Sequence, residues 1–327
     1  MQSFKILQKR IISQLDKESE KLNQLEPVNL YEPISYALQI GGKRLRPAMV
    51  LMACEMFGGQ LDDAMSAAIG IEVFHNFTLL HDDIMDNAPL RRNMPTVYKK
   101  YSTNVAILSG DGMFNLCYQY FLHTNNQYLN EILPLFSQTA NQVMEGQQYD
   151  MDFEKSEQVT IDSYLEMIKL KTAVLFACSL KIGAIIGGAS PSDANRLYNF
   201  GVNLGLVFQL QDDLLDVYSE PDKFGKQTGG DIALNKKTFL LIKSLELANV
   251  GQKEELLRWL AYENFNIEEK VKAVKTIYDE LEIQKTTCKA IEYFYNIAMN
   301  ELSVIELPSG QKEELILLVN QIMKREN

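Results

Sequence analysis

A chain of 327 residues is long enough to bury a substantial core, and its net charge of −11 argues against nucleic-acid binding, which needs a basic stripe. The 46% apolar and 23% charged residues are the content of a soluble globular protein. The four cysteines (Cys54, Cys117, Cys178 and Cys288) are widely spaced, which argues against a zinc cluster or disulfide scaffold and predicts reduced, buried thiols.

Helical periodicity runs through the whole chain, and strand-like alternation is hard to find. Helices are predicted, in chain order, over residues 3–24, 30–39, 47–57, 61–85, 104–121, 129–150, 160–187, 192–218, 236–248, 252–260, 267–302 and 311–325. The loops are predicted at 86–97 and 219–235. No stretch resembles an interdomain linker, so we expect one all-α domain over residues 1–327.

The N-terminal segment looks like an amphipathic helix without the long apolar core of a signal peptide. No apolar run is expected to reach membrane-spanning length, because Lys181 interrupts TAVLFACSLKIGAIIGG. The sequence therefore predicts a cytoplasmic protein.

Two segments, LLHDDIMD at 79–86 and QLQDDLLD at 209–216, place aspartates at positions i, i+1 and i+4 near the end of a predicted helix. The aspartates are Asp82, Asp83, Asp86, Asp212, Asp213 and Asp216. Mutual repulsion and the negative helix end both disfavour carboxylates there. Mg²⁺, which takes one or two carboxylates together with substrate phosphate oxygens, relieves that repulsion. One such motif is as well explained by a solvated acidic face, but two matched motifs with apolar flanks predict a metal site.

Basic residues accompany both aspartate motifs. They are Lys43, Arg44 and Arg46 in GGKRLRP, Arg91 and Arg92, Lys169 and Lys171, Lys223 and Lys226, and Lys236 and Lys237. Any single lysine is more often a solvated surface group, so the inference depends on their placement beside acidic motifs. Together they predict a polyanion bridged by Mg²⁺, with arginine giving bidentate phosphate contacts. No GxxxxGK[ST] loop and no GxGxxG after a strand is present.

The chain resembles the trans-isoprenyl diphosphate synthases, or polyprenyl synthetases. The pattern covers about residues 41–240, with GGKRLRP, HNFTLLHDDIMDNAPLRRNMPT, KTA, FQLQDDLLD and GKQTGGDIALNKKT in family order. The resemblance implies an all-α helical bundle around a deep central cavity (the isoprenoid synthase fold) and a homodimer. The chain departs from the family pattern at Asn235, where a glycine is usual, and at Leu240, where a proline is usual.

The activity implied by this resemblance is the condensation of isopentenyl diphosphate with an allylic diphosphate (dimethylallyl, geranyl or farnesyl). It proceeds by ionisation, condensation and elimination with release of diphosphate. The departing diphosphate can take the proton, so no dedicated histidine base is required. By resemblance, three Mg²⁺ are bound by Asp82, Asp83, Asp86 and Asp212, with Asp213 and Asp216 in support. The allylic diphosphate is contacted by Arg91, Lys171, Lys226 and Lys236, and isopentenyl diphosphate by Lys43, Arg46, His75 and Arg92. Thr172 and Gln209, beside Lys171, line the reacting carbons.

Product length depends on what blocks the floor of the cavity. Thr78 and Phe77 lie about one helical turn before Asp82, and Phe74 lies a further turn away. In the family, aromatic residues at these positions shorten the product, so the resemblance implies a short-chain synthase making 15- or 20-carbon products. The alternative is that Phe74 and Phe77 are ordinary core residues.

Competing functions make different demands on the sequence. A di-iron bundle needs the Glu-x-x-His pattern of Glu72 and His75 twice, and no second copy occurs. Terpene cyclases usually replace one aspartate motif by an Asn/Ser/Glu type, and neither they nor head-to-head synthases need GGKRLRP. A longer-chain polyprenyl diphosphate synthase and a catalytically weak subunit of a heteromeric synthase stay as alternatives, although such subunits generally lose aspartates that this chain keeps.

Overall fold

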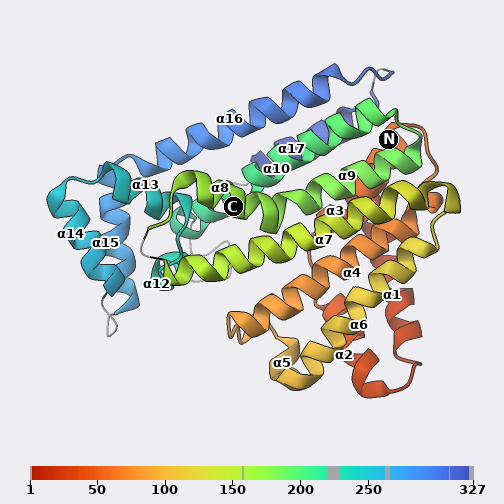
Figure 1. Ribbon diagram of the computed structural model, residues 1–327, viewed down its shortest axis with the longest axis horizontal. Helices are drawn as coiled ribbons and strands as arrows, with labels where there is room; N and C mark the ends of the chain where they lie inside the picture. Colours follow the sequence, from red (N-terminus) through yellow and green to blue (C-terminus); the bar gives the residue numbers. More distant parts are fainter. Residues whose placement is uncertain (1, 157, 220–228, 262–265, 309, 324–327) are drawn as a thin grey trace. The chain divides into compact units, whose positions relative to one another are not determined.

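The computed structural model describes residues 2–156, 158–219, 229–261, 266–308 and 310–323, which are almost entirely helical (Figure 1). The predicted all-α class is confirmed. The helices are α1 (Phe4–Leu22), α2 (Val28–Gln39), α3 (Leu45–Met56), α4 (Leu61–Met85), α5 (Val97–Lys100), α6 (Thr103–Leu122), α7 (Asn126–Lys155), α8 (Ile161–Ile168), the π-helix η1 (Lys169–Ala173), α9 (Val174–Gly187), α10 (Pro191–Tyr218), α12 (Gly230–Ala233), α13 (Phe239–Leu247), α14 (Val250–Ala261), α15 (Ile267–Glu280), α16 (Ile283–Val304) and α17 (Glu313–Met323). Two short strands, β1 (Leu90–Arg91) and β2 (Met94–Pro95), pair antiparallel inside the predicted 86–97 loop.

The chain groups into two compact units. Unit 1 contains Met1–Ser137, Cys178–Leu197 and Glu306–Ile316, and unit 2 contains Gln138–Ala177, Tyr198–Ile305 and Leu317–Asn327. The first aspartate motif belongs to unit 1 and the second to unit 2. The single domain expected from the sequence stays a prediction.

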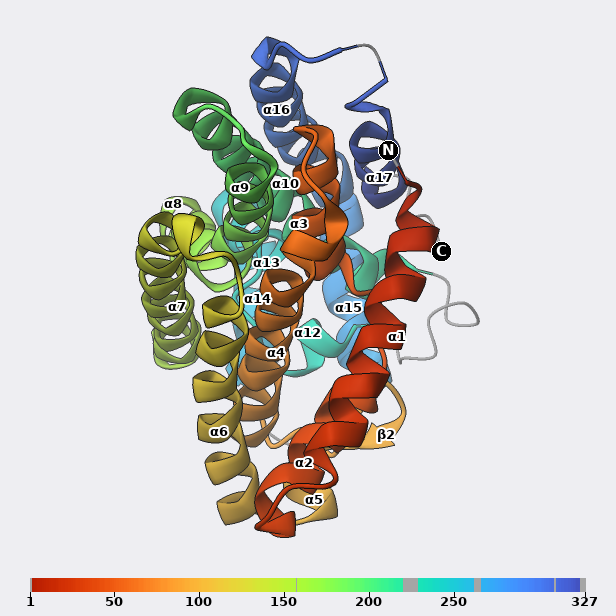
Figure 2. The same ribbon diagram turned by 90° about the vertical axis from the view of Figure 1, so that its right-hand side faces the viewer.

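Unit 1 is built around α4, which lies against α3 and α6, while α2 lies against α1 and α6 (Figure 2). Asp62 and Asp63 in the first turn of α4 complement the positive end of the helix dipole. Beyond them, apolar residues face all sides of the helix, and the run from Ala67 to Phe74 is buried throughout. A helix that is apolar all round is stable only as a core helix, and α4 is one.

Unit 2 has its own apolar core, formed by α8, α10, α13, α15 and α16. Tyr164, Leu210, Leu240 and Tyr278 are almost fully buried within it. The short helix α12 lies against α15, and α13 lies against α8, α15 and α16. This core therefore supports the segment that follows the second aspartate motif.

The helix predicted at 160–187 forms as α8, η1 and α9 in succession. It begins with a capping box in which Thr160 and Ser163 satisfy each other's backbone N–H groups. The segment Ile161–Gly187 passes a membrane-span test of length and composition alone, although Lys181 lies within it. However, 83% of its most apolar 18-residue segment is buried inside the protein, as in a core helix.

The helix predicted at 267–302 divides into α15 and α16. Glu282 adopts a left-handed conformation at the break, with φ 51°, and the Leu281 and Glu282 N–H groups bond to carbonyls of the preceding turn. No glycine or proline marks this position, so apolar periodicity alone did not reveal the break.

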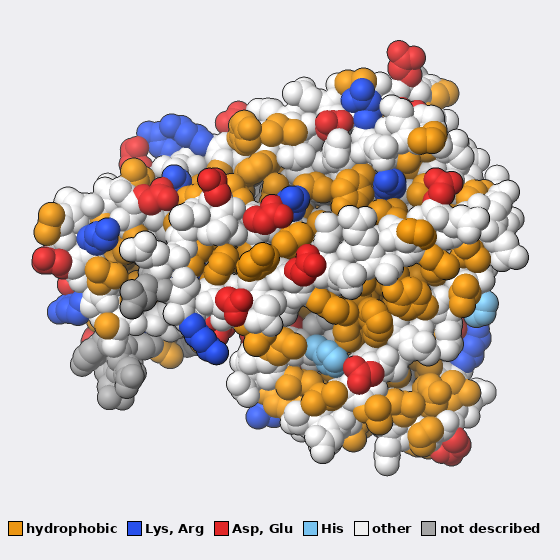
Figure 3. Space-filling model, viewed as in Figure 1, with side chains coloured by type: hydrophobic (Ala, Val, Ile, Leu, Met, Phe, Trp, Pro, Cys, Tyr) orange, Lys and Arg blue, Asp and Glu red, His pale blue; other side chains and the backbone are white. Residues whose placement is uncertain are grey.

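The cysteines only partly follow the expectation from the sequence. None of the four thiols forms a disulfide, and Cys54, Cys117 and Cys178 are buried, but Cys288 is exposed, which corrects the expectation of four buried thiols. On the face drawn in Figure 3, Lys and Arg side chains are interspersed with Asp and Glu side chains and form no basic stripe.

Candidate active site

The first aspartate motif occupies the last turn of α4, in unit 1. Asp83 is buried, 3% exposed, and its Oδ1 accepts hydrogen bonds from Arg91 Nε at 2.8 Å and Nη2 at 2.7 Å. The same Nη2 lies 3.6 Å from Asp82 Oδ2. Burial raises the pKa of Asp83, and the Arg91 guanidinium opposes that rise. Asp82 is half-buried and Asp86 is exposed, so the first and last carboxylates of the motif reach solvent while the middle one is held by Arg91.

The β1–β2 hairpin explains why two consecutive arginines have different partners. Arg92 and Asn93, at its tip, both have positive φ values of 53° and 62°, as the favoured two-residue hairpin turns require. Arg91 lies in β1 and contacts the aspartates, whereas the Arg92 guanidinium donates to the Gly41 carbonyl. The hairpin thus joins the aspartate motif to the GGKRLRP loop within unit 1.

Arg44 fixes the GGKRLRP loop from inside. It is 6% exposed, adopts φ 53°, forms an ion pair with Glu72 on α4 and donates to the Leu38 carbonyl at 2.5 Å. Asn76 Nδ2 also donates to Glu72 Oε1 at 3.0 Å. Glu72 is therefore committed to the loop, which removes the basis for a di-iron Glu-x-x-His site.

Residues predicted to bind isopentenyl diphosphate gather beside this loop. Arg46 Nη1 lies 3.2 Å from His75 Nε2. Burial and the surrounding arginines lower the pKa of His75 well below its usual value, so the ring is neutral and accepts from Arg46. Burial lowers the pKa of Arg46 to about 10, so it stays charged at neutral pH. Lys43 is exposed, and the neighbouring Gly42 has φ 128°, a conformation that favours glycine.

The second aspartate motif lies near the end of α10, in unit 2. Asp213 is 4% exposed and accepts from the Tyr164 hydroxyl at Oδ2 and from Gln209 Nε2 at Oδ1, the latter at 2.9 Å. Thr172 Oγ1 donates to Gln209 Oε1 at 3.1 Å. The structure therefore brings together Thr172 and Gln209, which the resemblance assigns to the reacting carbons, and connects both to the second aspartate motif.

The other two aspartates of this motif are more accessible. Asp212 is exposed, and Asp216 is half-buried, with its Oδ2 accepting from the Asp231 N–H at 2.9 Å. Burial, with Asp213 and Asp216 nearby, raises the pKa of Asp231 to about 8, and burial raises that of Asp213 to about 6. Carboxylates this crowded favour protonation until a cation joins them.

Lys171 lies in η1, a π-helical turn of the kind often found at functional sites. Its Nζ is 2.6 Å from Asp150 Oδ2 on α7. Two neighbouring helices approach the turn through glycines: a Cβ on Gly146 would lie 2.2 Å from the Lys171 backbone nitrogen, and one on Gly205 would lie 2.4 Å from Ala173 Cα. The π-turn is therefore held from two sides by close backbone contact.

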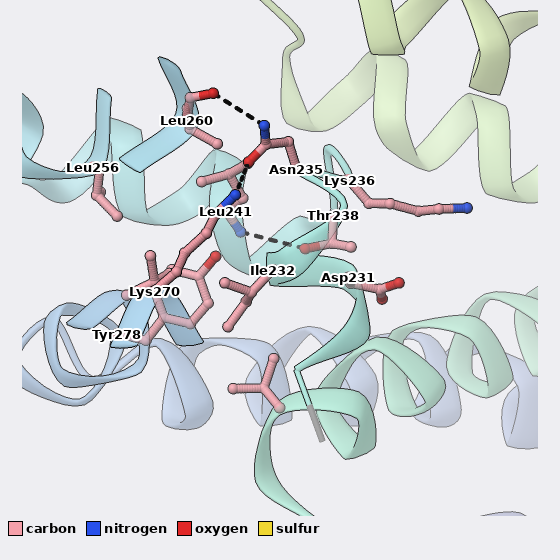
Figure 4. A pocket seen from close by; sticks show the side chains of 12 residues that line it. Asp231, Ile232, Asn235, Lys236, Thr238, Leu241, Leu256, Leu260, Lys270 and Tyr278 are labelled. Carbon is pink, nitrogen blue, oxygen red and sulfur yellow. Dashed lines mark hydrogen bonds between the residues drawn. The ribbon is translucent and has the colours of Figure 1, made fainter. Parts of the chain in front are cut away.

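Lys236 follows α12, and its N–H bonds to the Asp231 carbonyl at 2.9 Å. Figure 4 shows the side chains of Asp231 and Lys236 extending to the side opposite Lys270. Lys226, also predicted to bind the allylic diphosphate, lies outside the described residues.

Both motifs thus place their middle aspartate inside the protein and their outer aspartates toward solvent. Within the described part of the chain, no three His, Cys, Asp or Glu side chains form a ready metal cage. Mg²⁺ needs no such cage, since one or two carboxylates and substrate phosphates suffice. The accessible aspartates on each unit fit that demand.

The residues predicted to form the cavity floor belong to an aromatic cluster in unit 1. Phe77 is 5.3 Å from Phe114 and Phe74 is 5.1 Å from Phe136, between ring centroids. Tyr118 is 5.5 Å from Phe114. Thr78 is half-buried, with its hydroxyl donating to the His75 carbonyl at 2.8 Å. Phe114 and Tyr118, from α6, were not foreseen from the sequence.

Reasoning from the sequence also missed Tyr164, Asp150 and Asp231 as candidate site residues. Asp231 stands in the quoted GGDIALN segment, and its acidic character beside Lys236 was an available signal. Tyr164 and Asp150 had none, because their roles arise from side-chain contacts between helices α7, α8, η1 and α10.

The polyprenyl synthetase family model matches residues 27–281. A geranylgeranyl diphosphate synthase of Methanosarcina mazei is 37% identical over 287 residues, covering 86% of this chain and 83% of its own. A geranylfarnesyl diphosphate synthase of Natronomonas pharaonis is 39% identical over 242 residues, covering 68% and 71%. A crystal structure of a geranylgeranyl pyrophosphate synthase has a TM-score of 0.94 and 43% identity over all of both chains. The resemblance carried by the motifs is confirmed, and the chain belongs to the polyprenyl synthetase family.

Proposed function

We propose that this prenyltransferase is a short-chain synthase that adds isopentenyl diphosphate to an allylic diphosphate and stops at a 20-carbon product. The observation that supports it best is the matched arrangement of the two aspartate motifs, each with a buried middle aspartate and accessible outer ones. In each motif the middle aspartate is held by protein groups, and the outer two leave their carboxylates accessible to a cation.

Mg²⁺ supplies positive charge for the departing diphosphate when it is bound. We propose that Asp82, Asp86 and Asp212 are its main ligands and that Asp216 is in support. The resemblance placed Asp83 and Asp213 at or beside the metals. We propose instead that Asp83 orients Arg91 and that Asp213 orients Tyr164 and Gln209, through the hydrogen bonds that they accept. The number of ions, three by resemblance, belongs to this proposal.

The basic residues divide between the two substrates. We assign Arg91, Lys171, Lys226 and Lys236 to the allylic diphosphate, and Lys43, Arg46, His75 and Arg92 to isopentenyl diphosphate. The neutral His75 supports this division, because it keeps Arg46 oriented without adding charge. Arg46 and Arg92 then offer planar groups for bidentate phosphate contacts.

Ionisation of an allylic diphosphate generates a carbocation that water would quench. The hydroxyl of Thr172 and the amide of Gln209 form one hydrogen-bonded chain with Asp213, which fixes their orientation. We propose that the hydroxyl oxygen of Thr172 and the amide oxygen of Gln209, with the Lys171 segment, face the allylic carbocation as preorganised dipoles. The released diphosphate accepts the proton in the final elimination.

Product length is assigned to the aromatic cluster of α4 and α6. Phe77, one turn before the first aspartate motif on α4, contacts Phe114 on α6. Relatives are named geranylgeranyl and geranylfarnesyl diphosphate synthases, which supports 20 carbons with 25 as the alternative. A weakly active subunit is less well supported, since all six aspartates are present. A longer-chain synthase is less well supported because these two relatives are named for 20- and 25-carbon products. A homodimer and a cytoplasmic location belong to the proposal as well.

The test is a product assay with isopentenyl diphosphate, Mg²⁺ and, in separate reactions, 5-, 10- and 15-carbon allylic primers. Chain lengths are read by mass spectrometry after dephosphorylation. We expect all three primers to converge on the 20-carbon alcohol, with little 25-carbon material. Products of 30 carbons or more would contradict the proposed short-chain function, and an absence of any prenyl product would favour the subunit alternative.

A further inference from the structure

Lys270 is a fully buried lysine in α15, with 0% of its surface exposed. Its Nζ donates to Asn235 Oδ1 at 2.5 Å and to the Ala233 carbonyl at 3.3 Å (Figure 4). Asn235 Nδ2 donates in turn to the Leu260 carbonyl at 3.0 Å. One amide group therefore joins the loop after α12 to both α14 and α15.

The backbone at Asn235 favours the same arrangement. Its φ is 58°, in the left-handed region that glycine and asparagine adopt more readily than other residues. Glycine, the family's usual residue here, satisfies the backbone but offers no amide. The departure at Asn235 thus adds side-chain contacts that a glycine lacks.

The opposite side of this segment is attached to the second aspartate motif. The Gly229 N–H bonds to the Asp216 carbonyl at 2.6 Å, and the Asp231 N–H bonds to Asp216 Oδ2 at 2.9 Å. Lys236 follows Asn235 directly, and its own N–H bonds back to the Asp231 carbonyl. Lys236 therefore directly follows the residue attached to α15 and is hydrogen-bonded to Asp231, which is attached to α10.

The cavity beside these contacts is small, about 10 Å³, and is lined largely by apolar side chains, including Ile232, Leu241, Leu256 and Tyr278. A buried ammonium is unfavourable in such surroundings unless it is hydrogen-bonded. The two oxygens on the loop therefore help to stabilise the buried Lys270 ammonium, and Lys270 in turn helps to fix the position of the loop.

We propose that Lys270 and Asn235 form a positioning clamp that holds the 229–238 segment so that Lys236 can contact the allylic diphosphate. Neither residue touches substrate; both act through Lys236. This inference rests on the proposed function, specifically on the assignment of Lys236.

The test compares Asn235→Gly with Asn235→Asp. Both replacements suit a positive φ, but only aspartate keeps an oxygen for Lys270. Removing one hydrogen-bond partner of a buried charged donor is unfavourable, so we expect Asn235→Gly to raise the KM for the allylic diphosphate about tenfold. The KM for isopentenyl diphosphate should stay within about twofold, and Asn235→Asp should restore the allylic KM to within about threefold of wild type.

A second readout does not depend on activity. Hydrogen–deuterium exchange of the amides in residues 229–238 of the metal-free protein should be faster in Asn235→Gly than in Asn235→Asp. Lys270→Met, which keeps an apolar stem, should accelerate exchange in the same segment. If that variant does not fold, the two Asn235 variants decide the outcome alone.

The control is Lys236→Met. If it raises the allylic KM while Asn235→Gly leaves the KM and the exchange unchanged, the clamp is wrong and the proposed function stands. If Lys236→Met has no effect on the allylic KM, the clamp is overturned together with the assignment of Lys236, while formation of prenyl product by the wild type still supports the proposed function. The clamp would also be overturned if Asn235→Gly and Asn235→Asp raised the KM values for the allylic diphosphate and for isopentenyl diphosphate equally. That result would indicate a general structural defect.

Discussion

Asp83 and Asp213 are held by different chemistry although they occupy the same position in their motifs. Asp83 accepts a charged arginine, whereas Asp213 accepts a phenol and an amide. Arg91 offsets negative charge directly, but Tyr164 and Gln209 offer only dipoles. The pKa of Asp213 accordingly rises to about 6 through burial, with those two hydrogen bonds opposing the rise. The negative charge of the second motif is therefore less compensated by the protein than that of the first, so an added cation should stabilise it more.

The Phe77 ring is the residue whose removal should change the product. Phe77→Ala leaves a void beside Phe114, and the growing chain can occupy it. We expect products longer than 20 carbons, measured by the same mass-spectrometric assay. Phe121→Ala is the matched control, since that ring contacts Phe136 at 4.5 Å and should alter stability without altering length. An active Phe77→Ala enzyme with an unchanged product distribution would exclude Phe77 as the floor.

Asp231 should make the metal-free protein less stable as the pH rises. Its folded pKa of about 8 lies above the ordinary value of 3.8, so between these values the folded state keeps a proton that the unfolded state has released. The free energy of unfolding therefore falls with increasing pH, by up to about 1.4 kcal/mol per unit from this group. Asp231→Asn should flatten the fall between pH 5 and 8 in denaturant titrations with EDTA. Equal slopes for both proteins would contradict the assignment.

At the scale of elements, periodicity predicted most helices and their approximate limits, because buried faces repeat every three to four residues. The KTA and aspartate motifs also marked where the candidate site would form. The π-turn at Lys169–Ala173 was not predictable, since its i→i+5 bonding leaves no periodic signal and depends on Gly146 and Gly205 from other helices. The break at Glu282 was missed for the similar reason that no turn residue occurs there.

Gly146 tests the importance of the π-turn. A Cβ in Gly146→Ala would lie 2.2 Å from the Lys171 backbone nitrogen, so α7 and η1 must separate. We expect a loss of about 1–3 kcal/mol in the free energy of unfolding, together with a lower kcat because Lys171 and Thr172 move. Gly251→Ala on α14 is the control, since its Cβ would meet nothing closer than 3.6 Å. Equal stability and kcat in the two variants would show that the close approach is not required.

On the scale of the whole molecule, this acidic protein of net charge −11 carries basic residues close in sequence to both of its aspartate motifs. Unit 1 contains one aspartate motif with Arg46, Arg91 and Arg92, and unit 2 contains the other with Lys171 and Lys236. Under the proposed function, each unit would supply carboxylates for Mg²⁺ and basic groups for phosphate. Activity should depend on both sets, so loss of either one should abolish it.

The most direct measurement is the initial rate of prenyl diphosphate formation as a function of Mg²⁺ concentration. It compares the wild type with Asp82→Ala, Asp212→Ala and the exposed control Asp63→Ala on α4. We expect each motif variant to lose at least about a hundredfold in rate, a typical loss when one electrostatic stabiliser of the transition state is removed, and the control to match the wild type. A motif variant that folds and stays active with an unchanged Mg²⁺ dependence would contradict the account.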